Sequence, residues 1–305
     1  MKKIIKYLLL LCMSGILAAA SGHQVYHPHG TVYRQSDQLV NHQVANHPIE
    51  TSYGHHIWGR LYKPRQIKPK QGLPLIIYVH GYGSSYRSGV PYAQYFADRG
   101  YAVYTFDFFG GGPRTKSGGT MLDMTVKNEA DDLGEIINQL KLDPQIDADR
   151  IYLLGSSQGG FVSTLVASER DDIKSLLLIY PAFVLGNLVE DLYPEGQEIP
   201  ETFKFLGLEV SDDYALALSQ IDMEQVMASL TIPVLIFHGD HDQIIPIASS
   251  YHALDLFGQS QLVTYQGQGH GFDQATRSKA MEVMEEFLNY QEEKKEELDE
   301  FRDVR

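Results

Sequence analysis

Cysteine is nearly absent from this chain, which has one, Cys12, among its 305 residues. That cysteine lies in an N-terminal apolar segment, so the remainder of the chain can form no disulfide. Its stability must therefore come from a packed core rather than from cross-links.

The N-terminal apolar run, residues 7–17, is too short to span a bilayer. Three lysines precede it and three alanines follow it, ending at Ala20, which is typical of a secretory signal peptide. Residues 1–20 are therefore predicted to be removed on export, which leaves a secreted, periplasmic or cell-surface protein without a stable membrane anchor. Leu11, directly before Cys12, is unsuited to a lipoprotein signal.

Basic residues are fewer than acidic ones, 25 against 39, so the formal net charge is −14. This balance disfavours nucleic acid and anionic membrane surfaces as partners. Apolar residues make up 43% of the chain and charged residues 21%, which indicates one large globular domain. The oligomeric state is left open.

Three segments are predicted after the signal peptide. Residues 21–48 form a polar leader, residues 49–290 a domain whose first hairpin turns at 52–54, and residues 291–305 a charged helical extension or frayed tail. A solvated leader is favoured over a metal site because cysteine and regular spacing are missing, and no metal or organic cofactor is predicted. The leader's histidines are His23, His27, His29, His42 and His47.

Apolar strands alternate with amphipathic helices along the domain. Apolar side chains recur at helical spacing from Val126 to Leu140, and Asp143-Pro144 ends that helix. Such alternation predicts an α/β fold with a mainly parallel sheet and helices on both faces. The predicted strands include 75–80, 101–106, 151–154, 175–181, 233–238 and 261–265.

A possible nucleophile, Ser157, lies in Gly155-Ser156-Ser157-Gln158-Gly159, between an apolar strand and an apolar helix. G-x-S-x-G in this context is typical of a nucleophile elbow, a strained turn that exposes the serine hydroxyl above the sheet. The pentapeptide alone is weak evidence, because glycine and serine turns are common. The acidic residue and the histidine that follow later in the chain make the assignment of Ser157 as a nucleophile more specific.

A base and an acid come after the serine, each beyond a later strand. His270 lies in the glycine-rich sequence 267–271 and is predicted to take the proton of Ser157. Asp240 and Asp242 both follow strand 233–238. Asp242 is favoured as the partner that orients the imidazole, and Asp240 as a turn former.

Two backbone donors complete the predicted site. In this type of fold one N–H comes from the residue after the nucleophile, here Gln158, and one from the loop after an earlier strand, here Tyr82. They would form an oxyanion hole. His80 and Asp107, at the ends of their strands, are interpreted as structural residues that organise loops.

The chain resembles the bacterial cinnamoyl (feruloyl) esterases among the α/β hydrolases, from about Ile57 to Leu288. That resemblance implies Ser157 as nucleophile, His270 as base, Asp242 as its partner, and Tyr82 and Gln158 as oxyanion donors. The motifs that carry it are Gly59-Arg60-Leu61-Tyr62, His80-Gly81-Tyr82-Gly83, Asp107-Phe108, Asp123-Met124-Thr125-Val126-Lys127-Asn128-Glu129, Gly155-Ser156-Ser157-Gln158-Gly159-Gly160, His238-Gly239-Asp240-His241-Asp242 and Gly269-His270.

Two positions depart from the family pattern. Ser156 stands where members often have histidine, and Tyr82-Gly83-Ser84 stands where they often have Phe-Thr-Gly. Both changes keep the backbone N–H groups of the oxyanion hole, but they alter side chains that could contact the substrate. The resemblance therefore supports ester hydrolysis more strongly than it supports a cinnamoyl substrate.

Residues 182–231 separate two strands and are too many for an ordinary connection, which predicts a cap over the site. They contain ten acidic residues and one basic residue, Lys204, and such a cap disfavours anionic substrates. Its aromatic residues either contact the substrate or pack the cap onto the core. The candidates for substrate contact are Phe183, Tyr193, Phe203, Phe205 and Tyr214.

The sequence therefore predicts an exported serine carboxylesterase acting on small-molecule esters with small acyl or cinnamoyl groups. A serine peptidase or an acylglycerol lipase on the same scaffold is the alternative, since fold and triad do not fix the bond cleaved. A non-catalytic binding module is disfavoured because the ordered set of nucleophile, acid and base is complete.

Overall fold

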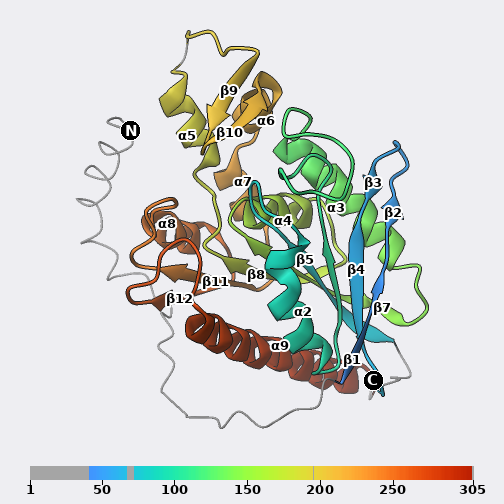
Figure 1. Ribbon diagram of the computed structural model, residues 1–305. Helices are drawn as coiled ribbons and strands as arrows, with labels where there is room; N and C mark the ends of the chain where they lie inside the picture. Colours follow the sequence, from blue (N-terminus) through green and yellow to red (C-terminus); the bar gives the residue numbers. More distant parts are fainter. Residues whose placement is uncertain (1–40, 67–71, 195, 304–305) are drawn as a thin grey trace.

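The computed structural model describes residues 41–66, 72–194 and 196–303, and its centre is an eight-stranded sheet (Figure 1). Six neighbouring strands are paired in parallel, and the other two extend one edge through antiparallel pairs. The predicted mainly parallel sheet is confirmed. In spatial order the strands are β1 (His42–Asn46), β4 (Gly59–Pro64), β6 (Ala102–Phe106), β5 (Leu73–Val79), β7 (Ile146–Ser156), β8 (Ile173–Ile179), β11 (Val234–Gly239) and β12 (Ser260–Tyr265).

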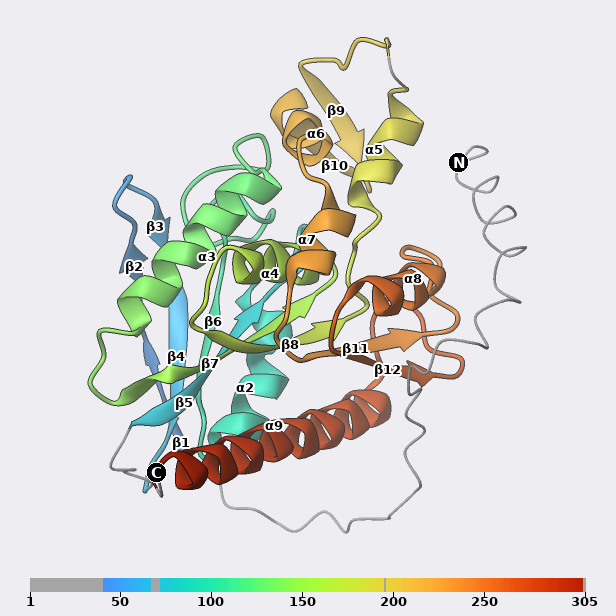
Figure 2. The same cartoon turned by 180° about the vertical axis from the view of Figure 1, so that it is seen from behind.

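Helices cover both faces of the sheet, as the alternation of elements predicts (Figures 1 and 2). The side chains of β5 alternate between two cores: Leu75 and Ile77 join one, and Ile76 and Tyr78 join the other. A strand that is buried on both faces reads as a continuous apolar run. The first core includes α3 (Val126–Leu140), α4 (Gln158–Ser168) and α8 (Ala248–Leu256), and the second includes α2 (Val90–Ala97) and α9 (Gln274–Asp303).

The start of α3 shows why a helix forms there. Thr125 is extended and its side chain accepts a hydrogen bond from the backbone N–H of Asn128 at 3.0 Å, which caps the helix. Glu129 lies in the first turn, and the apolar stripe from Val126 to Leu140 packs into the core.

The cap is the segment between β8 and β11, at the top of both views (Figures 1 and 2). Its two strands pair antiparallel in a small sheet of their own. It consists of α5 (Leu185–Leu192), β9 (Thr202–Phe205), β10 (Leu208–Ser211), α6 (Asp212–Ser219) and α7 (Met223–Ser229).

One predicted boundary needs correction. The sheet begins at β1, so a domain start at Ile49 is too late; only His42 of this edge strand is buried, which leaves no apolar pattern to reveal it. The charged stretch after residue 290 takes the helical one of its two predicted forms up to Asp303, and it continues the last core helix as α9. The predicted hairpin at 52–54 joins β2 (Ile49–Glu50) to β3 (His56–Ile57). The predicted signal peptide and the leader up to residue 40 lie outside the described residues.

The closest packing beneath the site involves Gly159. A Cβ atom at this position would lie 2.1 Å from the carbonyl oxygen of Val79 and 2.6 Å from that of His80. Both are backbone atoms, which cannot move aside as a flexible side chain could. Only glycine therefore lets the start of α4 approach the end of β5.

We expect Gly159→Ala to lower the free energy of unfolding by about 3 kcal/mol or more, the upper range for overpacking. The matched control is Gly134→Ala within α3, where a Cβ would meet no atom within 4 Å. It should raise stability by about 0.5–1 kcal/mol through helix propensity. Urea unfolding of both variants checks this; equal effects would contradict the packing argument.

Candidate active site

Ser157 lies in the tight turn between β7 and α4 with φ 53° and ψ −122°. This left-handed backbone conformation is strained for a residue with a Cβ, and such strain is concentrated at functional sites. The backbone N–H of Ser157 donates to the carbonyl of Ile179 at 2.9 Å, which fastens the turn to the end of β8. The side chain is half-buried at the carboxyl edge of the sheet.

The structure brings His270 and Asp242 to this serine. His270 follows β12, and its Nε2 lies 2.9 Å from Ser157 Oγ. Its Nδ1 lies 2.7 Å from Asp242 Oδ2, on the loop after β11. The three side chains form one hydrogen-bonded row although 113 residues separate His270 from Ser157.

Asp242 is held as a carboxylate. Burial alone would raise its pKa, but hydrogen bonds from His238 and His270 outweigh burial and hold the pKa well below its ordinary value. Its other oxygen accepts from the backbone N–H groups of Ile244 and Ile245, each at 2.9 Å. The carboxylate is therefore fixed from two sides before any substrate binds.

Asp240, the competing candidate, points elsewhere. It is exposed, and its Oδ1 accepts from the backbone N–H of Gly267 at 2.6 Å. That bond joins the loops after β11 and β12, which is the turn-forming role predicted for it.

Two residues beside this row were missed by sequence reasoning. The Tyr180 ring lies 4.5 Å from the His270 ring, between centroids, and its backbone has φ 38°. His238 is fully buried with its Nε2 3.3 Å from Asp242 Oδ2. One signal in the sequence could have indicated the contact of His238 with Asp242: the two residues are four positions apart across the end of a strand.

The loop after β5 runs directly beside the nucleophile. A Cβ added to Gly81 would lie 2.9 Å from the Cβ of Ser157, so glycine is needed there. Tyr82 follows on this loop, and Gln158 is the first residue of α4. The first N–H groups of a helix have no partner within the helix, so that of Gln158 is suited to an oxyanion.

His80 and Asp107 hold the neighbouring loops. Burial lowers the pKa of His80, which favours the neutral ring. Its Nδ1 lies 2.9 Å from the carbonyl oxygen of Gly81. Its Nε2 accepts a hydrogen bond from the backbone N–H of Phe108 at 3.1 Å. Asp107 is fully buried and accepts from the N–H groups of Tyr86 and Lys116 at 2.6 and 2.8 Å. Both contacts are those of structural residues.

The side chain of Gln158 joins the site to the cap through a buried network. Its Nε2 donates to Glu129 at 2.7 Å, and its Oε1 accepts from the Tyr214 hydroxyl at 2.8 Å. A second link runs from the Tyr82 hydroxyl to the carbonyl of Phe205 at 2.9 Å. Each of the two predicted oxyanion residues thus contacts a residue of the cap.

Most of the aromatic residues predicted to contact substrate are packed within the cap. Phe203, Phe205 and Tyr214 are buried, and Tyr193 packs edge-on against Phe203 at 5.3 Å. Phe205 and Tyr214 also pack against the ring of Tyr82, at 5.5 and 5.9 Å between ring centres, and contact with a substrate stays a prediction.

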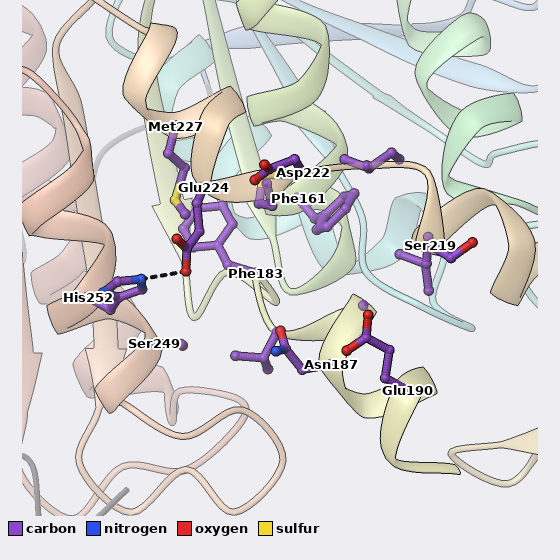
Figure 3. A pocket seen from close by; sticks show the side chains of 15 residues that line it. Phe161, Phe183, Asn187, Glu190, Ser219, Asp222, Glu224, Met227, Ser249 and His252 are labelled. Carbon is purple, nitrogen blue, oxygen red and sulfur yellow. Dashed lines mark hydrogen bonds and ion pairs between the residues drawn. The ribbon is translucent and has the colours of Figure 1, made fainter. Parts of the chain in front are cut away.

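Phe183 lines a cavity of about 230 Å³ between the cap and the core helices α4 and α8 (Figure 3). Phe161, on the next turn of α4 after Ser157, forms another part of the apolar wall. Three acidic residues, Glu190, Asp222 and Glu224, give the cavity a negative rim. His252 pairs with the last of them at 2.9 Å.

Within the ranges that the structure describes, no group of three or more His, Cys, Asp or Glu side chains is arranged to hold a metal ion. Among those same residues, no helix combines the length and the apolar character needed to cross a membrane.

A serine elbow at the carboxyl edge of this sheet, with a histidine and an aspartate beyond later strands, defines an α/β hydrolase. More specifically, the chain belongs to the prolyl oligopeptidase family, whose model matches residues 90–295.

Known proteins are similar over most of the chain. Est1E from Butyrivibrio proteoclasticus, solved with ferulic acid bound, is 27% identical; the match covers 80% of this chain and 98% of Est1E, with a TM-score of 0.72. YitV of Bacillus subtilis, which bears the name of an esterase, is 24% identical over 72% of this chain and 90% of its own length. YuxL of Bacillus subtilis, named an uncharacterized peptidase, is 24% identical over 77% of this chain but only 37% of its own length. These likenesses confirm the predicted resemblance to α/β hydrolases and support a hydrolase activity.

The Glu129 network gives a testable pH dependence. Burial raises the pKa of Glu129 from 4.5 to about 8, the hydrogen bond from Gln158 lowers it in part, and nearby Asp132 raises it further. Between these two pH values the unfolded chain releases the proton before the folded protein does, so stability falls as the pH rises.

Glu129→Gln has no proton to lose. We expect its free energy of unfolding to rise relative to the wild type between pH 5 and about 8 and then to level off. Urea unfolding across this range measures the difference. A difference that stays constant with pH would show that Glu129 does not titrate there.

Proposed function

We propose that this protein is an exported serine hydrolase that cleaves carboxylic esters through Ser157, His270 and Asp242. The observation that carries the proposal is the hydrogen-bonded row of these side chains, with distances of 2.9 and 2.7 Å, ending on a serine in a strained turn. The N-terminal pattern of lysines, apolar run and alanines supports export.

In the first half of the reaction, Ser157 Oγ attacks the ester carbonyl carbon while His270 Nε2 takes the hydroxyl proton. Asp242 holds the opposite ring nitrogen protonated and stabilises the imidazolium. The backbone N–H groups of Tyr82 and Gln158 donate to the oxyanion that forms. The tetrahedral intermediate then expels the alcohol, which takes the proton from His270 and leaves an acyl-enzyme.

In the second half, His270 takes a proton from water, and the resulting hydroxide attacks the acyl carbonyl. The intermediate collapses, Ser157 regains its proton from His270, and the acid is released. The same residues thus act in both halves with reversed proton transfer.

Esters of small acyl or hydroxycinnamic acids are the proposed substrates. The 27% identity to Est1E, together with bound ferulic acid in that structure, supports this class. The cavity that Phe183 lines includes none of Ser157, His270 and Tyr82, so the proposed substrate class rests on the likeness to Est1E and not on this cavity.

A serine peptidase is the second candidate, because the matching family model is that of the prolyl oligopeptidases. The same row of residues can attack an amide carbonyl, so substrate comparison must decide. Acylglycerol hydrolysis is tested in the same comparison.

We expect kcat/KM to be highest on methyl ferulate or p-nitrophenyl acetate, lower on a monoacylglycerol, and lowest on aminoacyl p-nitroanilides. Ser157→Ala should reduce turnover of the best substrate by about 10³-fold or more. Faster cleavage of the anilides than of both esters would replace the esterase proposal with the peptidase.

The two aspartates form a matched pair. Asp242→Asn should lower kcat by about 10⁴-fold because it leaves the imidazole in the wrong tautomer. Asp240→Asn, at an exposed carboxylate that bonds only the Gly267 N–H, should change kcat far less. The reverse order of effects in steady-state kinetics would refute the assigned roles.

A further inference from the structure

Three cationic side chains gather around two aromatic rings outside the catalytic row. The Arg60 guanidinium lies 5.3 Å from the centre of the Trp58 ring and 5.2 Å from that of Tyr86. Lys116 Nζ lies 3.9 and 5.1 Å from the same two rings, and Arg87 lies 5.8 Å from Tyr86. We call Trp58, Arg60, Tyr86, Arg87 and Lys116 the basic cluster.

The three cations lack carboxylate partners. Across the described part of the chain, none of them forms an ion pair, although the protein carries a net charge of −14. Asp107 lies behind the cluster, but its oxygens bond the backbone N–H groups of Tyr86 and Lys116. Elsewhere in the described part of the domain some basic side chains form ion pairs, namely Lys63, Arg99, Lys141, Arg150 and Arg170, and others, such as Lys174, form none.

The cations of the cluster act on the hydroxyl of Tyr86. Hydrogen bonding from Arg87 lowers its pKa, burial opposes this shift, and the charges of Arg60 and Lys116 lower the pKa further. Tyr82, on the same loop, shifts in the opposite direction because burial raises its pKa. Like charges held together repel, and the cation–π contacts with Trp58 and Tyr86 offset part of that repulsion.

The basic cluster lies at the catalytic edge of the sheet. Tyr86 begins η1 (Tyr86–Gly89), directly after the loop that carries Tyr82. Trp58 precedes β4 and accepts a hydrogen bond from the N–H of Asp107, at the end of β6. The strand β7 leads into Ser157. In the sheet, β4 and β6 lie on one side of β7, and β8, which precedes the cap in the chain, lies on the other side.

We infer that the basic cluster is a binding site for ligands that carry carboxylate groups. Guanidinium and ammonium groups are strong, charge-assisted donors to carboxylates, and an anion here would relieve their mutual repulsion. The site goes beyond the proposed reaction, since it needs no bond cleavage. Two sources share this chemistry: an acidic saccharide in the alcohol part of a substrate, and the acid released by hydrolysis.

Trp58 provides a built-in probe, because it is the only tryptophan in the sequence. Binding is measured by its fluorescence and by titration calorimetry in a Ser157→Ala background, where no ester turnover interferes. The probes are trigalacturonate, its neutral methyl ester, and ferulate. Saturable binding of trigalacturonate identifies the saccharide source, and saturable binding of ferulate identifies the released acid.

Arg60→Gln with Lys116→Gln should weaken the binding of the carboxylate probe by about tenfold or more, since tenfold corresponds to about 1.4 kcal/mol. Arg87→Gln, at an exposed side chain, provides an independent variant with a smaller expected loss. Lys174→Gln, an exposed lysine at the start of β8 on the opposite edge of the sheet, is the matched control and should bind as before.

Absence of binding by both acids would overturn the inference, as would equal binding of the neutral methyl ester or equal loss in the Lys174→Gln control. Because binding is measured without turnover, its failure leaves the proposed esterase activity untouched. Failure of the ester panel likewise leaves this site untouched.

Discussion

The close approach of α4 to β5 is the constraint on which the rest of the site depends. Gly159 allows the helix to start against the carbonyl oxygens of Val79 and His80, and the chain must therefore turn sharply at Ser157. The same approach places Gly81 against the serine and brings the Tyr82 loop beside the first N–H of α4. Ser157 and the two residues proposed as oxyanion donors, Tyr82 and Gln158, are thus positioned by one packing contact between backbones.

Sequence order could predict this edge of the molecule because parallel strands all deliver their carboxyl ends to the same side. Ser157, Asp242 and His270 each follow a strand with a clear apolar pattern, and the structure places them within hydrogen-bond distance; their catalytic roles stay a prediction. The edge strand β1 could not be found in this way, because its exposed residues carry no apolar pattern. The contact of Tyr180 with His270 was equally hidden, since it is made between loops, and the contact of His238 with Asp242 was indicated only by their four-residue spacing.

Polar contacts connect the cap to the carboxyl edge of the sheet. The sequence motifs include residues of these contacts but do not indicate which atoms bond. Glu129 belongs to the most specific motif of the resemblance, yet nothing in its spacing indicates a bond to the side chain of Gln158. Tyr214 bonds the same amide from the cap, so neighbours on two other elements fix the orientation of the Gln158 side chain. Buried hydrogen bonds of this kind hold the cap against Gln158 and Tyr82, so an adjustment of the cap would reach these two residues directly.

Net charge gives a misleading picture of this surface, because it averages over groups that the fold separates. The acidic residues of the cap belong to the segment between β8 and β11, while Arg60, Arg87 and Lys116 come from three distant segments to meet around the ring of Tyr86. A substrate that contacts both the cap and the basic cluster would therefore meet opposite potentials at its two ends. Such a gradient orients a polar ester before any specific contact forms, since the wrong orientation places like charges together at both ends. Discrimination between substrates would then depend on where a molecule carries its charge rather than on how much charge it has.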